Sequence, residues 1–308
     1  MPRPAVDVVV PFLGPPTELA ELAGRLAELR LGPQDSVTIV DNRPGARHGG
    51  AQRGGPRVLA APERQTPGFA RNRGAARGDA EWIVFLDADT APPAYLLDRL
   101  FQPAPREETG LLAGGVIDEP RPEAGREPPA ARWARLTASM SQDSTLGLGR
   151  FGFAQTVNCA VRRAAFQSVG GFRDELRACE DADLCFRLEA AGWAIERRER
   201  AAVVHRSRRT LLGLLEQQLV HGAGIGWLER QYPGFSPAHR WPGFLLWGVR
   251  HASRGLVHAL RDRNGDAALV ALVDPVVAWT RELGRRRSNV VDGPTASAAA
   301  PARARQAR

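Results

Sequence analysis

Two acidic clusters are the first candidates for chemistry in this chain. Asp87-Ala88-Asp89 follows the apolar run 82–86, so both carboxylates are expected to emerge together from the end of a buried strand. Carboxylate oxygens in that position suit a hard cation such as Mg²⁺ or Mn²⁺, which proteins commonly share with substrate phosphates. Because Asp-x-Asp triplets are common, a solvated loop is the competing interpretation.

The second cluster, Glu180-Asp181-Ala182-Asp183, lies at the predicted start of a helix. Acids there are stabilised by the positive end of the helix dipole, which is a purely structural explanation. The functional alternative is a general base, because a carboxylate near an acceptor hydroxyl can remove its proton during attack. Of the three acids, we expect Asp183 to serve only the start of the helix.

Two further polar residues end predicted strands. Asp41 follows the apolar run 37–40, where it either caps the next turn or accepts a hydrogen bond from a base or ribose. His205 follows the run 202–204, where an ordinary surface role competes with contact to a metal or a phosphate.

The elements that must position these residues follow from the apolar pattern. Strand candidates at 6–10, 37–40, 58–60, 82–86, 111–117, 157–161, 193–195 and 202–204 alternate with helical patterns at 19–29, 69–77, 181–191 and 211–230. This alternation predicts an α/β fold with a mostly parallel, doubly wound sheet flanked by helices. Ligands of such sheets bind beyond the carboxyl ends of the strands, where the acidic clusters and Asp41 are expected.

The pattern divides the chain into three parts. Residues 1–234 are expected to form the main domain, in two halves, 1–118 and 119–234. The stretches 120–129 and 139–150 are expected to be loops. Amphipathic helices fill 235–287, and the Ala/Pro/Arg-rich stretch 288–308 is predicted to be a disordered tail.

Composition limits the classes of partner and the location that we expect for this chain. All 42 basic side chains are arginine, which together with 34 acidic side chains gives a formal net charge of +8. A GC-rich coding bias explains this most simply, so no nucleic-acid partner is expected. Three cysteines, no leader-like apolar segment and no run of about 18 apolar residues favour a cytoplasmic location.

The segment 241–279 raises one further alternative. It combines Trp241, Phe244, Leu245 and Trp247 with basic residues. Packing of these side chains onto the core is the favoured interpretation, because Trp and Leu at helical spacing usually indicate burial. Peripheral contact with an anionic membrane, on its inner face, is the alternative.

Taken in order, the fragments of this chain resemble the family 2 glycosyltransferases of the GT-A fold, over about residues 5–234. The fragments are VVVPFLG, VTIVDN, GFARNRGAARGDAEWIVFLDADT, TVNCAVRRAAFQSVGGF, EDADLCFRLEAAGW and VVH. A further stretch, HGAGIGWLERQYPG, is similar to actinobacterial members of the mycofactocin type.

The resemblance implies that 1–118 is the nucleotide-binding half and 119–234 the acceptor half, with loops 120–129 and 139–150 shaping acceptor specificity. It also implies a role for each matching residue. Asp181 would be the catalytic base, with Glu180 beside it, while Asp89 and His205 would contact a Mn²⁺ or Mg²⁺ ion. Arg187 would stabilise the leaving phosphate or pair with Glu180 or Asp183. The remaining donor-binding residues implied by the resemblance are Pro11, Asp41, Arg71, Asn72, Asp87 and Ala88.

The resemblance also implies the reaction. A sugar would move with inversion from a nucleotide-diphosphate-sugar donor, with a UDP-sugar favoured, to a hydroxyl acceptor that the sequence does not identify. The Gln-x-x-Arg-Trp signature of processive members is missing, which favours a single addition. Two alternatives remain: a nucleotidyltransferase that makes a nucleotide sugar, and a non-catalytic scaffold of the same fold.

Overall fold

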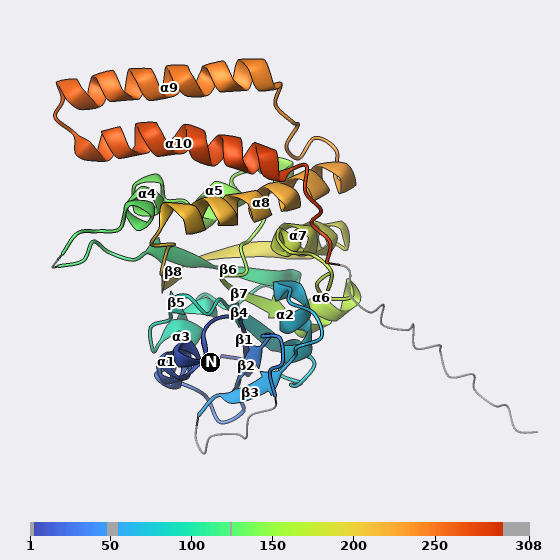
Figure 1. Cartoon of the computed structure of the whole chain (residues 1–308). Helices are drawn as coiled ribbons and strands as arrows, with labels where there is room; N and C mark the ends of the chain where they lie inside the picture. Colours follow the sequence, from blue (N-terminus) through green and yellow to red (C-terminus); the bar gives the residue numbers. More distant parts are fainter. Residues whose placement is uncertain (1–2, 48–54, 124, 292–308) are drawn as a thin grey trace, which may run out of the picture.

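A computed structural model describes residues 3–47, 55–123 and 125–291, and its centre is one mixed sheet (Figure 1). The sheet has the strand order β3-β2-β1-β4-β7-β6-β8-β5. Its strands are β1 (Val6–Phe12), β2 (Ser36–Asp41), β3 (Arg57–Ala60), β4 (Trp82–Leu86), β5 (Thr90–Ala91), β6 (Thr109–Asp118), β7 (Asn158–Arg162) and β8 (Ala194–His205). Helices flank the sheet, as the sequence predicted for this fold class.

The first four strands of that order form a parallel half. β3, β2, β1 and β4 pair in parallel, with Phe12 opposite Asp41 and Val9 opposite Phe85. Strands covered on both faces read as continuous apolar runs, and all five residues of β4 are buried. The carboxyl ends of these strands therefore lie together at one edge of the sheet.

Helices cover the two faces of this half. They include α1 (Pro16–Ala27), α2 (Pro67–Ala75), α3 (Leu96–Leu100), α6 (Arg163–Ser168) and α7 (Glu180–Ala190). Alternate strand residues point to opposite faces. Val8 of β1 thus packs in a cluster with Leu22 of α1 and leucines of α3, whereas Val9 packs with Ala70 of α2 and Leu184 of α7.

The other half of the sheet mixes directions. β7 pairs antiparallel with β4 and β6, whereas β8 runs parallel to β6 with a register shift between Gly114 and Gly115. β8 is a single strand where the sequence predicted two short ones, 193–195 and 202–204. The charged residues between those runs stay in the strand, because partners elsewhere in the fold bind them.

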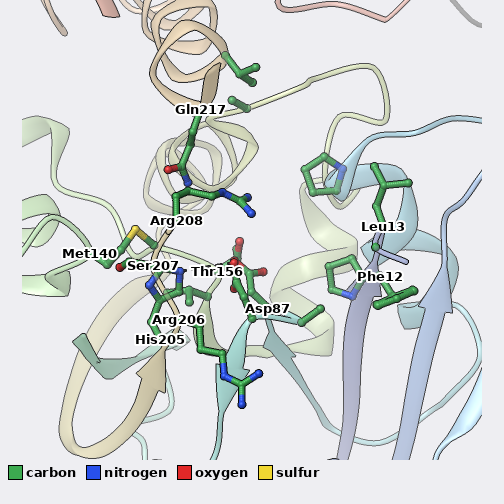
Figure 2. Close-up of a pocket in the computed structure, with 18 of the residues that line it drawn as sticks. Phe12, Leu13, Asp87, Met140, Thr156, His205, Arg206, Ser207, Arg208 and Gln217 are labelled. Atoms are coloured by element: carbon green, nitrogen blue, oxygen red, sulfur yellow. Dashed lines mark ion pairs between the residues drawn. The ribbon is translucent and has the colours of Figure 1, made fainter. Parts of the chain in front are cut away.

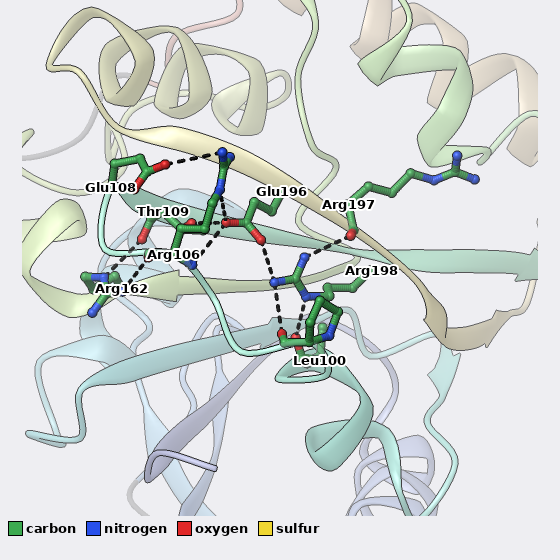
Figure 3. A network of polar contacts seen from close by, with 9 residues as sticks. Leu100, Arg106, Glu108, Thr109, Arg162, Glu196, Arg197 and Arg198 are labelled. Carbon is green, nitrogen blue, oxygen red and sulfur yellow. Dashed lines mark hydrogen bonds and ion pairs between the residues drawn. The ribbon is translucent and has the colours of Figure 1, made fainter. Parts of the chain in front are cut away.

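Glu196 is the centre of that polar network (Figure 3). Its carboxylate accepts hydrogen bonds from Thr109, from Nη2 of Arg198 at 2.6 Å and from Nε of Arg106 at 3.0 Å. Nε of the buried Arg198 donates to the carbonyl oxygen of Leu100 at 3.0 Å. Charge pairing thus supports a strand segment that hydrophobic periodicity does not predict.

Three long helices follow the sheet: α8 (Leu211–Gln231), α9 (Trp241–Arg261) and α10 (Gly265–Gly284). α10 lies between the other two, and α9 is the outermost helix, at the top of Figure 1. Glycines allow the close packing, because a Cβ on Gly222 would lie 2.0 Å from the carbonyl oxygen of Arg281 and one on Gly248 would lie 2.2 Å from the Trp279 ring. In the part of the chain that the structure describes, no helix is long and apolar enough to cross a membrane.

Shorter helices fill the segment between β6 and β7. They are α4 (Pro129–Thr137), α5 (Gln142–Leu146) and a 3₁₀ turn, η1 (Gly149–Phe151). α4 packs against α8 and α10, with Trp133 in a small apolar cluster beside Leu214 and Val277. The predicted loop 139–150 therefore contains a helix, with its own backbone hydrogen bonds.

The end of the described chain corrects one boundary. Residues 288–291, predicted as the beginning of the disordered tail, instead pack on the segment before α7. Buried Asn289 exchanges two hydrogen bonds with Ala178, Nδ2 donating at 2.9 Å and Oδ1 accepting at 3.1 Å, and Val290 pairs with Leu176. A bidentate backbone contact of this kind orders a polar segment that composition alone marks as disordered. The rest of the predicted tail lies outside the described residues.

Candidate active site

One large cavity, of about 1230 Å³, opens at the carboxyl ends of β1 and β4. The end of β1 and the start of α2 line one side, and the end of β8 with the first turns of α8 lines the other. Figure 2 shows Asp87 between Phe12 and Leu13 on one side and the stretch from His205 to Arg208 on the other. Of the predicted site residues, those that line the cavity are Pro11, Arg71, Asp87, Ala88, Asp89, Glu180, Asp181 and His205.

The short strand β5 brings Asp89 and His205 together. Thr90 pairs with His205 across the β5–β8 ladder, and the backbone N–H of Arg206 donates to the Asp89 carbonyl at 2.8 Å. As a result, Nε2 of His205 lies 3.6 Å from Oδ2 of Asp89. Residues more than one hundred positions apart thus form one local pair.

A second acid lies on the other side of the His205 ring. Asp118, at the end of β6, places Oδ1 3.9 Å from Nδ1 of His205. Burial lowers the pKa of His205, but the neighbouring carboxylates of Asp118 and Asp89 outweigh that effect and raise the pKa to about 9. Oδ1 of Asp89 is buried and has no hydrogen-bond partner among the described residues.

These two side chains suit a divalent cation. Among residues 3–47, 55–123 and 125–291, no group of three or more His, Cys, Asp or Glu side chains is placed to hold a metal ion. An unpaired carboxylate oxygen beside a histidine nitrogen nevertheless matches the donor set of a cation that displaces the proton from that nitrogen and takes its remaining oxygens from phosphate and water. The residues therefore fit Mn²⁺ or Mg²⁺ as a cation shared with a diphosphate.

Arg71 links the two acidic clusters. Its Nη2 donates to Oδ1 of Asp87 at 2.6 Å and its Nη1 donates to Oε1 of Glu180 at 2.5 Å. The side chain is buried, which by itself lowers the pKa of Arg71, but the two carboxylates raise the pKa well above its usual value. The guanidinium thus stays charged and fixes the acid after β4 relative to the start of α7.

Asp181 is the acid best placed to take up a proton. Burial and the adjacent Glu180 charge both disfavour its ionised form and raise its pKa to about 7, against a smaller opposing effect from Arg71. The N–H of Ala182 donates to its Oδ1 at 2.8 Å. A carboxyl with a pKa near neutrality can act as a general base at physiological pH.

The turn before Asp181 has an unusual backbone. Cys179 caps α7 with a φ of 61°, in the left-handed region that non-glycine residues rarely adopt. Gly224 of α8 packs directly against Cys179, because a Cβ on Gly224 would lie 2.6 Å from the Cys179 sulfur. α8 and Asn289 therefore fix the segment that presents the acid.

Three predicted donor-binding residues do not line the cavity. Asp41 caps its own turn by accepting from the backbone N–H of Arg43 at 3.2 Å, and its carboxylate also binds that guanidinium. Asn72 donates to the Phe172 carbonyl at 2.8 Å, which ties α2 to the loop before α7. Arg187 pairs with Asp183 at 2.7 Å, which was the alternative to a phosphate contact.

Asp183 has a larger structural role than the predicted helix start. It is fully buried and accepts hydrogen bonds from the Tyr232 hydroxyl at 2.8 Å and from Nε of Arg173 at 3.2 Å, in addition to Arg187. Its carboxylate therefore joins α7 to the end of α8. Burial and this carboxylate raise the pKa of Tyr232 to about 12, so the phenol stays protonated.

Sequence reasoning missed several residues that line the cavity. Arg25 of α1 donates to the Ala88 carbonyl at 2.8 Å, and its buried Nε has no partner among the described residues. Gln217 and His221 reach the cavity from α8. Nothing in the local sequence marks these three, whereas Arg206 and Arg208 belong to a basic run, RSRR, directly after β8.

Comparison with known proteins gives a family match and several relatives. The family model described as glycosyl transferase family group 2 matches residues 82–276. The pre-mycofactocin glycosyltransferase of Mycobacterium tuberculosis is 27% identical over 180 residues, which cover 57% of this chain and 37% of the relative. The glycosyltransferase AglE of Haloferax volcanii is 28% identical over 139 residues, or 45% of this chain and 43% of the relative. The chain thus spans less than half the length of these curated relatives.

A solved structure supports the fold. The mannosyltransferase PcManGT from Pyrobaculum calidifontis, in complex with GDP-Man and Mn²⁺, matches with a TM-score of 0.59 at 14% identity, covering 92% of this chain and 88% of that one. The predicted GT-A architecture is confirmed by this likeness.

Proposed function

This chain belongs to glycosyl transferase family group 2, and from that premise we propose that it transfers a sugar from a nucleotide-diphosphate-sugar donor to an acceptor hydroxyl with inversion. One observation carries the proposal: Asp181, with its pKa near 7, faces the same cavity as the Asp89–His205 pair. A proton acceptor and a candidate diphosphate site thus meet where the fold places its ligands.

Asp181 supplies the base. Its carboxylate removes the proton of the acceptor hydroxyl as that oxygen forms a bond to the anomeric carbon. The bond from this carbon to the diphosphate oxygen breaks, and its electron pair leaves with the nucleotide diphosphate. Attack from the side opposite the leaving group inverts the configuration. Positioning of the two reactants in one cavity supplies much of the rate enhancement.

The diphosphate side is built from Asp89, His205 and nearby arginines. Asp89 and His205 would hold Mn²⁺ or Mg²⁺, which when bound offsets negative charge on the departing diphosphate. Arg206 and Arg208 follow directly after the histidine and line the same wall. Their charge attracts a diphosphate before the reaction and stabilises it afterwards.

The nucleotide and the acceptor are assigned to opposite walls. Pro11, Phe12 and Asn42 offer the nucleoside a wall at the ends of β1 and β2. The acceptor enters between the first turns of α8, with Gln217 and His221, and the segment around Met140. We propose a single addition, with the donor base open between uridine and guanosine.

Transfer is tested with a panel of UDP- and GDP-sugars in the presence of Mn²⁺, Mg²⁺ or a chelator. Donor binding is measured by calorimetry and transfer by release of the nucleoside diphosphate. The acceptors are simple glycosides, a lipid phosphate and pre-mycofactocin, which the name of the M. tuberculosis relative suggests. We expect one donor to bind in a metal-dependent way.

Three variants make the test specific. Asp89→Asn should weaken metal-dependent binding, Asp181→Asn should leave binding intact and abolish transfer, and the exposed Asp79→Asn should change neither. If no nucleotide sugar binds with any cation, the enzymatic proposal fails and a scaffold role takes its place.

A further inference from the structure

The α9–α10 hairpin carries apolar side chains that the fold leaves in solvent. On α9, Leu245, Val249 and Leu260 are 45, 56 and 76% exposed, and half-buried Leu256 completes the series. Their spacings of four, seven and four residues place all of them on one stripe of a helix. A continuous stripe, unlike scattered exposed leucines, indicates an interaction surface.

α10 continues this surface. Leu272, Val276 and Leu283 are 51, 40 and 49% exposed, again at spacings of four and seven residues. Nε2 of His251 lies 3.6 Å from Oδ2 of Asp274, which marks one flank of the hairpin.

That ion pair shows which flank carries the stripes. His251 lies two residues after Val249, and Asp274 lies two residues from both Leu272 and Val276. Helix positions two residues apart point about 200° apart. Both stripes therefore lie on the flank opposite the ion pair, and together they form one surface, the apolar flank (Leu245, Val249, Leu256, Leu260, Leu272, Val276 and Leu283).

The charged side chains of α9 itself have one sign. α9 contains no Asp or Glu, whereas Arg250, Arg254 and Arg261 are exposed and form no ion pair among the described residues. Asp266 and Asp274 of α10 both have partners: Asp266 binds Arg132 at 2.5 Å, and Asp274 accepts from Trp133 of α4 at 2.6 Å. The outermost helix thus presents leucines, valines and unpaired cations.

We propose that the α9–α10 hairpin docks on the surface of an anionic phospholipid bilayer. An apolar stripe bordered by arginines is the pattern of a helix that lies in the interface, with its apolar side chains among the acyl chains and its cations among the head groups. A second copy of this chain fits less well, because it would bring one set of unpaired arginines against another. α9 is the helix farthest from the sheet in Figure 1, so the hairpin projects from the body of the protein.

The proposal is tested by flotation of the full chain with vesicles, a readout independent of transferase activity. The vesicles contain phosphatidylcholine, with or without 30% phosphatidylglycerol. We expect binding to the anionic vesicles and at least tenfold less to the neutral ones. Val249→Glu with Leu260→Glu should abolish it, and Arg250→Gln with Arg254→Gln and Arg261→Gln should weaken it by roughly 100-fold, given the usual contribution of a basic residue at an anionic surface.

Matched controls separate docking from general effects. Leu31→Glu changes a leucine that is 47% exposed and lies away from the hairpin, and Arg30→Gln with Arg57→Gln and Arg77→Gln removes the same charge from the residue range 1–118. Both should bind like the wild type, with unchanged circular dichroism and melting temperature in every variant. No vesicle binding by the wild type, or binding that survives the hairpin changes, overturns the proposal. A dimer in light scattering that the Val249→Glu and Leu260→Glu changes dissolve would do so as well, assigning the flank to self-association.

Discussion

Asp87 and Glu180 are held by the two terminal nitrogens of one buried guanidinium, that of Arg71. One acid follows β4, and the other begins α7 next to the proposed base. One guanidinium therefore bridges the proposed donor side and the proposed acceptor side of the cavity. A change at Arg71 should disturb catalysis before it disturbs the fold.

Replacing Arg71 tests this coupling. Arg71→Lys keeps the charge but cannot form both hydrogen bonds. We expect kcat to fall roughly 100-fold through misplacement of the reacting groups. Arg73→Lys, two residues on and half exposed in a pair with Glu63, is the matched control and should have wild-type kinetics. Equal losses in the two variants would argue against a positioning role.

The pH dependence of transfer should reveal Asp181. Because its pKa is raised to about 7, the active carboxylate form is scarce at pH 5.5, and kcat/KM should climb through pH 7 and level off above it. Glu180→Gln removes a charge that raises this pKa, so the midpoint should move to lower pH. Asp181→Asn should reduce the rate by about 100- to 10,000-fold above pH 7, and by less at pH 5.5, where the wild type is itself mostly protonated. A profile that is flat between pH 5.5 and 8.5 would rule Asp181 out as the titrating base.

Asp118 should matter for metal affinity without touching the metal. It lies behind His205, on the side opposite Asp89. Acids that orient a metal-binding histidine typically contribute 10- to 100-fold to affinity. Asp118→Asn should therefore weaken Mn²⁺-dependent donor binding by that factor in calorimetry. Donor binding measured in a chelator should stay the same, and a loss there would point to general damage instead.

Glu196 should stabilise the fold in a pH-dependent way. Burial raises its pKa, but hydrogen bonds from Thr109, Arg198 and Arg106 outweigh this and lower the pKa to about 2 (Figure 3). A depressed carboxyl pKa stabilises the fold above the unfolded value of 4.5, and the effect is lost as the pH falls towards 2. Glu196→Gln should cost about 1.5–3 kcal/mol of unfolding free energy at pH 7 and much less at pH 3. Glu199→Gln, on the same strand but 77% exposed, is the control in urea titrations.

Gly224 should be needed for the turn that carries Asp181. A Cβ there would lie 2.6 Å from the Cys179 sulfur and 3.0 Å from the Ala178 carbonyl. Gly224→Ala should therefore lower kcat more than it raises the KM of the donor. Gly24→Ala, in α1 with nothing within 4 Å, should instead stabilise the protein by about 0.5–1 kcal/mol. Thermal melts and steady-state kinetics on both variants distinguish the effects.

The local sequence pattern predicted where strands end and which polar residues follow them. The run before Asp87 showed that acids would emerge at the ligand edge, and the start of α7 placed Asp181. What local pattern does not contain is a partner supplied by packing. Arg198 is charged yet buried, and because partners from packing bind it, the chain continues as one strand, β8, where two were predicted.

The same limit applies to the site. Arg71 was expected only near the nucleotide, whereas its contact with Glu180 crosses 109 positions. Gln217 and His221 were not predicted, because their place at the cavity depends on where α8 docks. For Arg187 the sequence allowed either a phosphate or an acid as the partner, and the structure shows that it pairs with Asp183.

The contact between Asn289 and Ala178 has a consequence for synthesis. A chain made from its N-terminus can fold the sheet and present the nucleotide wall while it is still being translated. The loop before Asp181 gains its last hydrogen bonds only when Asn289 has left the ribosome. Nascent chains would thus acquire the proposed donor site before the segment that carries Asp181 is fully ordered.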